Sequence, residues 1–171
     1  RCKKDGKTKG VKALLIYPMN ALIDDQGERL CELAASLNKS LKGEDQIRVG
    51  RYTGNRGERE AHDQENPGLI IDHRETLCED PPDILLTNYK MLDLMLFRPD
   101  EQGFWQQDTK DVFRYLVLDE LHTFDGAQGA DVACLIRRLK LKLEVDITCV
   151  GTSATVAAGA KGDKDAKKKL P

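Results

Sequence analysis

Five short apolar runs constrain the fold of this chain more than any other feature of its sequence. Each run is rich in aliphatic or branched residues, which is typical of strands buried on both faces of a sheet. Helical patterns or long connections separate the runs, and strands joined in that way pair in parallel under a cover of helices. We therefore expect an α/β fold with a parallel sheet and helices on both faces. The predicted strands are 11–17, 47–53, 83–87, 115–119 and 147–150.

Apolar residues at helical spacing predict most of the segments between these strands. The first helix is expected to take Asn20 as its N-cap and to hold Asp24 and Asp25 in its first turn, where the helix dipole favours acids. A short helix is expected around 73–79, and a loop or insertion at 98–112. Two further helices are predicted at 90–97 and 132–143. The apolar stripe of the first helix is Leu22, Leu30, Leu33, Ala34, Leu37 and Leu41.

The composition excludes several classes of protein. The chain has 171 residues and is 40% hydrophobic, which suits one domain with its own core and argues against a disordered chain. No apolar run is long enough to cross a membrane and no secretory signal is visible, so we expect a cytoplasmic protein with no membrane contact. The five cysteines include no CxxC pair, which excludes a zinc ribbon and disfavours a disulfide framework.

The charge of the chain is unevenly distributed. The formal net charge is −2, of which residues 1–12 carry +5 and residues 160–171 carry +3, so residues 13–159 carry −10. An acidic body does not attract nucleic acid by its bulk charge. Any contact with a phosphate backbone would therefore depend on local features such as helix N-termini.

Polar, glycine or turn residues follow every predicted strand. Ligands of parallel α/β sheets bind outside the carboxyl ends of the strands, so these residues mark a candidate functional edge. Strands commonly end in turns, which explains part of the convergence without any function. The residues at these ends are Pro18, Met19, Asn20, Thr53, Gly54, Thr87, Asn88, Asp119, Glu120 and those at 151–153.

The segment 116–124, LVLDELHTF, carries the strongest chemical signal. A buried strand leads directly to two adjacent carboxylates, Asp119 and Glu120, which point in opposite directions and can take different roles. One can hold a divalent cation, and the other can orient or deprotonate an attacking water. His122 is a candidate for linking this loop to its neighbour. The alternative interpretation is an ordinary acidic turn after a strand.

DELH after an apolar strand resembles motif II, the Walker B element, of the superfamily 2 DExH helicases. The segments YPMNAL, TNY and DELHTFDGAQGADVA are most similar to the Lhr/YprA-like branch of large DNA helicases. This ordered resemblance covers about 11–156 and implies the RecA-like fold of P-loop NTPases. The other segments that resemble helicase motifs are LLIYPMNALIDDQ at 14–26 for motif Ia, RYTGN and DILLTNYKML for the Ib region, and GTSAT for motif III.

The resemblance implies roles for individual residues. Asp119 would hold the Mg²⁺ of a bound ATP through water, and Glu120 would position or activate the water that attacks the γ-phosphate. A nucleic-acid strand, DNA in preference to RNA, would be held mainly by its backbone phosphates. The residues implied in coupling the two sites are His122, Ser153, Ala154 and Thr155. The residues implied in the phosphate contacts are Pro18, Met19, Asn20, Gly54, Thr87 and Asn88.

Motif I of this family, a glycine-rich loop that cradles phosphates, is not recognisable in the sequence. Gly6, Lys7 and Thr8 spell its last three letters, but no strand precedes them and a strand follows at once. We therefore expect the P-loop and a second RecA-like domain to lie outside this sequence, which makes the RecA-like sheet incomplete. The predicted organisation is a basic lead-in loop at 1–10, a partial RecA-like domain at 11–156 and a charged tail at 157–171.

The sequence leaves two functions open. The first is part of the ATPase core of an ATP-dependent DNA or RNA helicase or translocase, with the isolated piece inactive as an ATPase. Its partners would be nucleic acid and the remainder of the parent helicase chain. The alternative is a non-catalytic module with a degenerate helicase fold that binds nucleic acid or another protein. Binding of a strand by this chain, together with no ATP hydrolysis by a longer protein that contains it, would favour the alternative.

Overall fold

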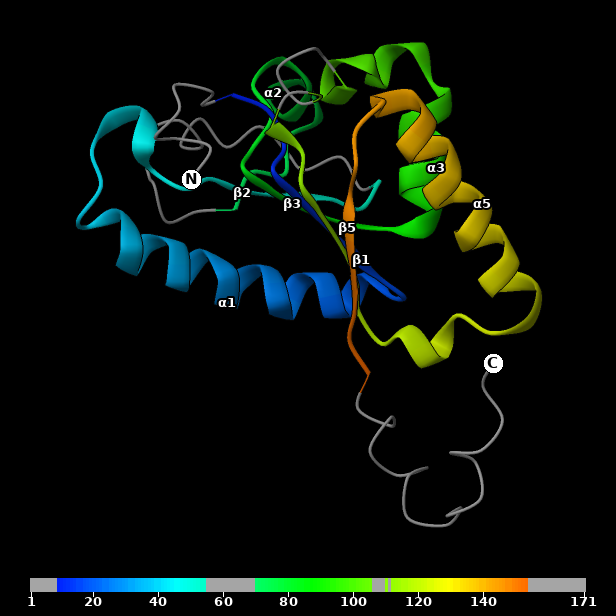
Figure 1. Ribbon diagram of the computed structural model, residues 1–171. Coiled ribbons are helices and arrows are strands. Elements are labelled where there is room, and N and C mark those ends of the chain that lie inside the picture. Colours follow the sequence, from blue (N-terminus) through cyan, green and yellow to red (C-terminus); the bar gives the residue numbers. More distant parts are fainter. Residues whose placement is uncertain (1–8, 55–69, 106–109, 111, 154–171) are drawn as a thin grey trace.

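Five parallel strands form one open sheet in the computed structural model (Figure 1). The structure describes residues 9–54, 70–105, 110 and 112–153. The strand order is β2-β3-β1-β4-β5, so the first strand in the sequence lies at the centre. The predicted parallel sheet is therefore confirmed. The strands are β1 (Ala13–Tyr17), β2 (Val49–Tyr52), β3 (Ile84–Asn88), β4 (Tyr115–Leu118) and β5 (Thr148–Gly151).

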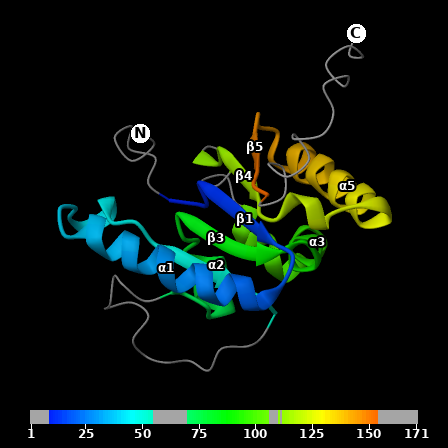
Figure 2. The same ribbon diagram turned by 90° about the horizontal axis from the view of Figure 1, so that it is seen from below.

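Helices cover both faces of the sheet, as predicted (Figures 1 and 2). Helix α1 (Asn20–Asn38) packs on one face with β1, β2 and β3, and its core cluster includes Ile23 and Leu86. The larger cluster, on the other face, joins the sheet to α2 (Arg74–Glu79), α3 (Tyr89–Phe97) and α5 (Gly126–Leu143). In the part of the chain that the structure describes, no helix has the length and apolar character needed to cross a membrane.

The first turn of α1 differs from the prediction. Met19 is the N-cap residue and makes no side-chain capping bond, and Asn20 is already the first helical residue. Because the helix begins there, no acidic residue lies in its first turn. Asp24 instead forms an ion pair with Arg51 of β2 at 2.7 Å, which ties α1 to the neighbouring strand.

The buried stripe of α1 also differs from the predicted one. Leu33 and Leu37 are 61% and 56% exposed, whereas Ala34 is buried. Gly27 and Asn38, one small and one polar, lie on the buried face and determine it. A Cβ on Gly27 would lie 2.6 Å from the side chain of Ile70, and the Asn38 amide bonds both backbone groups of the residue at 47. Close approach and hydrogen bonding therefore override the leucine periodicity here.

The segment predicted as a loop at 98–112 contains the 3₁₀ helix η3 (Pro99–Trp105), which is part of the core. Phe104 is 0% and Trp105 is 4% exposed, so this part of the predicted loop or insertion belongs to the main core. A Cβ on Gly103 would lie 2.4 Å from the backbone oxygen of Cys78, which shows how closely η3 approaches α2. The indole of Trp105 donates a hydrogen bond to the backbone oxygen of Met95 at 2.9 Å.

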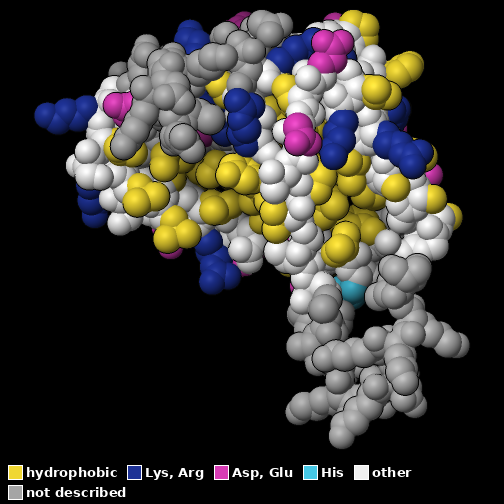
Figure 3. Space-filling model, in the orientation of Figure 1, with side chains coloured by type: hydrophobic (Ala, Val, Ile, Leu, Met, Phe, Trp, Pro, Cys, Tyr) yellow, Lys and Arg dark blue, Asp and Glu magenta, His cyan; other side chains and the backbone are white. Residues whose placement is uncertain are grey.

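Strand β5 is exposed, although the sequence predicts a buried strand. All four of its residues are exposed, and it pairs with β4 along one side only. On β4, Tyr115 is 52% exposed. Figure 3 shows apolar side chains on both sides of β5 in the face that it presents. The described chain therefore leaves one edge of the sheet, and the apolar surface beside it, uncovered.

Candidate functional site

The parallel register brings the carboxyl ends of all five strands to one edge of the sheet. Tyr17 of β1 pairs with Asn88 of β3, and Leu118 of β4 pairs with Gly151 of β5. At the same carboxyl ends, Tyr52 of the outer strand β2 pairs with Thr87 of β3. The residues that follow these positions share the edge at which parallel α/β sheets bind ligands.

Asp119 extends β4 and is joined to the loop after β5. Its backbone N–H donates to Ile16 of β1 at 2.9 Å, and its Oδ1 accepts a hydrogen bond from the Thr152 hydroxyl. Backbone bonds join the same loops, because Leu121 donates to Thr152 at 2.8 Å and Thr152 donates to Leu118 at 2.9 Å. Thr152 was predicted to lie at the candidate edge, as one of the residues at 151–153, but no role was predicted for its side chain.

Glu120 has the left-handed backbone conformation, with φ 50° and ψ 48°. A residue with a Cβ adopts this conformation at some cost, and such residues gather at functional sites. The turn directs the carboxylate back toward the 3₁₀ helix η4 (Leu121–Thr123). Its Oε2 is buried and accepts no hydrogen bond, although Nδ1 of His122 lies 3.2 Å away. One carboxylate oxygen at this edge is therefore shielded from water and left for a further partner.

His122 connects the carboxylate of Glu120 to the loop after β5. Its Nδ1 lies 2.9 Å from the Ser153 hydroxyl, so the loops after β4 and β5 are joined by side chains as well as by backbone. The predicted residues Asp119, Glu120, His122 and Ser153 thus lie together. Ala154 and Thr155 lie outside the described residues.

A second group of predicted residues surrounds the N-termini of α1 and α3. Asn88 donates from Nδ2 to Oδ1 of Asn20 at 2.7 Å. Asn88 also caps α3, because its Oδ1 accepts from the backbone N–H of Met91 at 2.9 Å. Pro18 and Met19 lead into α1, and Met19 is 58% exposed. Two helix N-termini with their free N–H groups therefore lie next to each other at this edge.

Gly54 and Thr87 occupy the adjoining part of the edge. Thr87 is 0% exposed, and its hydroxyl donates to the backbone oxygen of Tyr52 at 2.6 Å. Gly54 has φ 85°, and a Cβ there would lie 2.8 Å from the sulfur of Met91. The side chain of Thr87 therefore holds strand β2, and the exposed Gly54 turn follows directly from that strand.

Alkaline pH is expected to destabilise the fold through Tyr17, which lies close to Asp119. Burial, and to a lesser extent the charge of Asp119, raises the pKa of Tyr17 from 10.0 to about 12. The unfolded chain loses this proton near pH 10 while the folded chain keeps it, so the stabilising contribution is complete below pH 10. It is lost as the pH rises to about 12, by up to ~1.4 kcal/mol per pH unit.

Urea unfolding at a series of alkaline pH values measures this effect. Tyr17→Phe should show a shallower loss of stability than the wild type, and Tyr115→Phe, at a half-exposed tyrosine, should not. Equal slopes for the wild type and Tyr17→Phe would exclude this role of Tyr17.

The two carboxylates fit a magnesium nucleotide. Mg²⁺ is commonly bound by one or two carboxylates together with water and substrate phosphates. Asp119 and Glu120 supply two carboxylates at the binding edge, and Oε2 of Glu120 accepts no hydrogen bond although Nδ1 of His122 lies 3.2 Å away. Among the described residues, no cluster of three or more metal-ligating side chains forms a complete protein site. This donor set fits an ion held largely by water and phosphate oxygens.

Known proteins with similar sequences include two ATP-dependent helicases of archaea. The Druantia protein DruE of Escherichia coli is 38% identical over 69% of this chain, and the match covers 7% of DruE. The ATP-dependent helicase Lhr-Core of Methanothermobacter thermautotrophicus is 26% identical over 91% of this chain and 16% of its own length. The chain therefore matches a small part of each relative.

Solved helicase structures share the fold. The DUF1998 helicase MrfA bound to DNA and AMPPNP is 26% identical, with a TM-score of 0.63, and the match covers 91% of this chain and 19% of that chain. This likeness confirms the RecA-like class expected for the sheet. A family model described as DEAD/DEAH box helicase matches residues 2–161, nearly the whole sequence. The chain belongs to the DEAD/DEAH box helicase family and is homologous to its Lhr-type members.

Proposed function

We propose that this chain forms part of the ATPase core of an ATP-dependent helicase or translocase that acts on DNA. Asp119 would hold Mg²⁺ through water, and Glu120 would orient the attacking water and accept its proton. The bound Mg²⁺ would neutralise charge that develops on the phosphates. The observation that carries this proposal is the placement of both carboxylates at the carboxyl edge, with the buried Oε2 of Glu120 left without a hydrogen-bond donor.

The contacts between the loops after β4 and β5 support a coupling role. Asp119 is joined to Thr152, and His122 is joined to Ser153. A change at the carboxylates on hydrolysis would therefore be transmitted directly to the segment at 152–153. Side chains that bridge two loops in this way give the loops a shared response to the bound nucleotide.

The nucleic-acid strand would bind beside the paired asparagines. The N-termini of α1 and α3 present backbone N–H groups and the positive ends of two helix dipoles, which favour phosphate. Asn20 and Asn88 hold these termini together at 2.7 Å. Amide donors suit a chain whose central part is acidic, and the related helicase MrfA is bound to DNA in its solved structure. Phosphate contacts carry little sequence information, so we expect weak sequence preference.

The uncovered edge of β5 supports the view that this chain forms one part of the ATPase core and that another segment of polypeptide completes it. The four exposed residues of β5 would become interior once another parallel strand paired with them. We propose that the strand and glycine-rich loop that cradle the phosphates supply this pairing, and that a second RecA-like domain completes the nucleotide site. The partner is then the remainder of a larger helicase chain.

Hydrolysis of ATP by a longer polypeptide tests the proposed function. A protein that joins this chain to a P-loop segment and a second RecA-like domain should hydrolyse ATP slowly alone and faster when single-stranded DNA is added. Hydrolysis is measured as phosphate release, with and without a dT oligonucleotide. Absence of hydrolysis together with salt-dependent binding of the oligonucleotide would replace this proposal with a non-catalytic binding module.

A further inference from the structure

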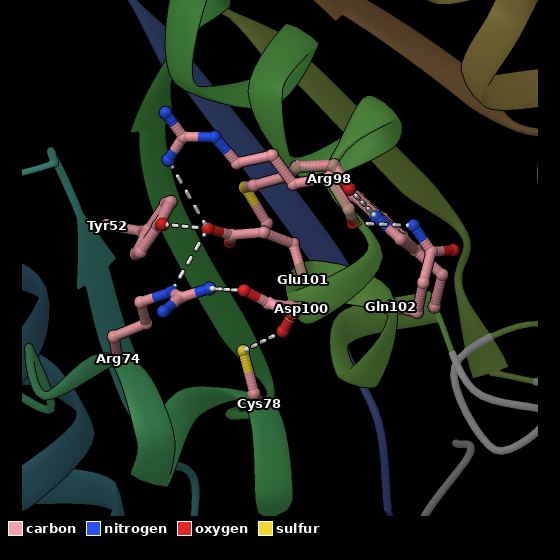
Figure 4. A network of polar contacts seen from close by, with 9 residues as sticks. Tyr52, Arg74, Cys78, Arg98, Asp100, Glu101 and Gln102 are labelled. Atoms are coloured by element: carbon pink, nitrogen blue, oxygen red, sulfur yellow. Dashed lines mark hydrogen bonds and ion pairs between the residues drawn. The ribbon is translucent and has the colours of Figure 1, made fainter.

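Glu101 is a wholly buried carboxylate that lies away from the acidic pair at 119 and 120. It is 0% exposed, and its Oε1 accepts a hydrogen bond from the Tyr52 hydroxyl at 2.5 Å. The same oxygen accepts from Nε of Arg74 at 3.1 Å and lies 3.8 Å from Nη1 of Arg98 (Figure 4). The other oxygen, Oε2, is buried and has no hydrogen-bond partner. Three residues from separate elements thus converge on one atom of Glu101.

The energetics of this network do not favour a role in stability alone. Removing a carboxylate from water is energetically costly, and ion pairs with partly exposed arginines offset that cost incompletely. An unpartnered Oε2 adds a further cost. An apolar residue at this buried position would carry neither cost. What the carboxylate supplies and an apolar residue does not is a directional acceptor for the Tyr52 hydroxyl.

Tyr52 is the last residue of β2 and lies directly before the candidate binding edge. Its backbone oxygen accepts the hydroxyl of Thr87, and Gly54 follows two residues later. Burial and the contact with Glu101 raise the pKa of Tyr52 above its ordinary value. A shift of the Tyr52 ring would therefore move the backbone that Thr87 contacts and that leads into Gly54.

The opposite face of β2 is held in a similar way. Arg51 forms ion pairs with Asp24 of α1 at 2.7 Å and with Asp72 at 2.8 Å. Because neighbouring residues of a strand point to opposite faces, the end of β2 is held by polar contacts from both sides just before the Gly54 turn. Such contacts fix the position and direction of a strand end more narrowly than apolar packing does.

We propose that Glu101 is a positioning residue for nucleic-acid binding, which acts through Tyr52 to set the Gly54 turn relative to Thr87 and Asn88. This inference rests on the proposed function, because it assumes that the strand binds at this edge. Glu101 itself is buried and touches no ligand. Its effect is to keep the edge in the geometry that binds phosphate, so that little ordering is left to occur on binding.

Binding of a fluorescent dT oligonucleotide to the 171-residue chain, measured by anisotropy at low salt, tests the inference. Glu101→Ala and Tyr52→Phe should each weaken binding by about tenfold. Glu101→Gln should restore most of the affinity, because the amide oxygen still accepts the Tyr52 hydroxyl. The double variant of Glu101→Ala with Tyr52→Phe should bind no more weakly than either single variant.

Trp105→Phe is the matched control. It removes the hydrogen bond from Trp105 to Met95 and so loosens the same 3₁₀ helix without a change at Tyr52. Thermal unfolding of each variant shows how much stability it loses. Weakened binding in Glu101→Ala and Tyr52→Phe, with near-normal binding in an equally destabilised Trp105→Phe, supports positioning. Equal affinity in all variants, or an equal loss in Trp105→Phe, overturns it.

Amide hydrogen exchange separates this inference from the proposed function. If the wild-type chain fails to bind the oligonucleotide at low salt, the proposed strand contact is wrong. Faster exchange at Gly54 and Thr87 in Tyr52→Phe, but not in Trp105→Phe, would still show that the network holds the edge. Unchanged exchange at both positions would contradict the inference even if the wild type binds. Tyr52→Phe removes a single oxygen, so it provides the test if Glu101→Ala does not fold.

Discussion

Replacement of Glu120 by glutamine in the longer ATP-hydrolysing polypeptide is expected to lower the hydrolysis rate by about 10²–10⁴-fold. Glutamine retains the size and the hydrogen-bonding oxygen of the side chain but cannot accept a proton from water. The nucleotide itself would be bound mainly by phosphate contacts and by the Mg²⁺ at Asp119. Binding of a fluorescent ATP analogue should therefore change little, while phosphate release should nearly stop.

Glu144→Gln is a suitable control for this change. In the part of the chain that the structure describes, Glu144 and Glu120 are the two residues other than glycine with positive φ, at 55° and 50°. Glu144 lies at the C-terminal end of α5, away from the carboxyl edge, so the control reproduces the substitution and the backbone strain without the chemistry. Normal hydrolysis by Glu120→Gln would remove Glu120 from the proposed mechanism.

Phe104→Ala is expected to lower the free energy of unfolding by about 3–5 kcal/mol. Phe104 is 0% exposed, and its ring contacts those of Tyr52 and Trp105 with centroid distances of 5.4 and 6.4 Å. Phe97→Ala is the matched control, because Phe97 is 80% exposed at the end of α3. Its loss should change stability by no more than about 0.5 kcal/mol. Urea unfolding of the three proteins measures both values.

The comparison between these two phenylalanines tests whether η3 belongs to the core. A similar, small effect of both substitutions would mean that 98–105 behaves as a surface segment. A large effect of Phe104→Ala alone would show that this short 3₁₀ helix stabilises the sheet as the long helices do.

The order of strands and helices along the chain could be predicted because each depends on local patterns. The apolar run before Asp119 and the spacing from Val132 to Leu143 are long or regular enough to specify β4 and α5. The segment at 98–105 could not be predicted in the same way. Its sequence, RPDEQGFW, reads as polar and turn-rich, and its burial depends on Tyr52 and Arg74, which lie far away in the sequence.

In the candidate site, too, some features could be predicted from the sequence and others could not. That Asp119 and Glu120 share an edge with Asn20 and Ser153 follows from the parallel sheet, so this placement could be predicted. The partners of individual side chains could not. The hydrogen bond from Thr152 to Asp119, the left-handed conformation of Glu120 and the pairing of Asn20 with Asn88 depend on how separate loops meet. No local pattern in the sequence predicts these contacts between loops.

The open side of β5 also affects how the isolated chain would behave at high concentration. A strand with an unpaired side can pair with the same strand of another molecule, and exposed apolar residues of the strand such as Val150, which is 41% exposed, strengthen that association. Charged residues that discourage such pairing are absent from the four positions of β5, Thr148–Gly151. We therefore expect this edge to self-associate whenever no strand of its own protein covers it.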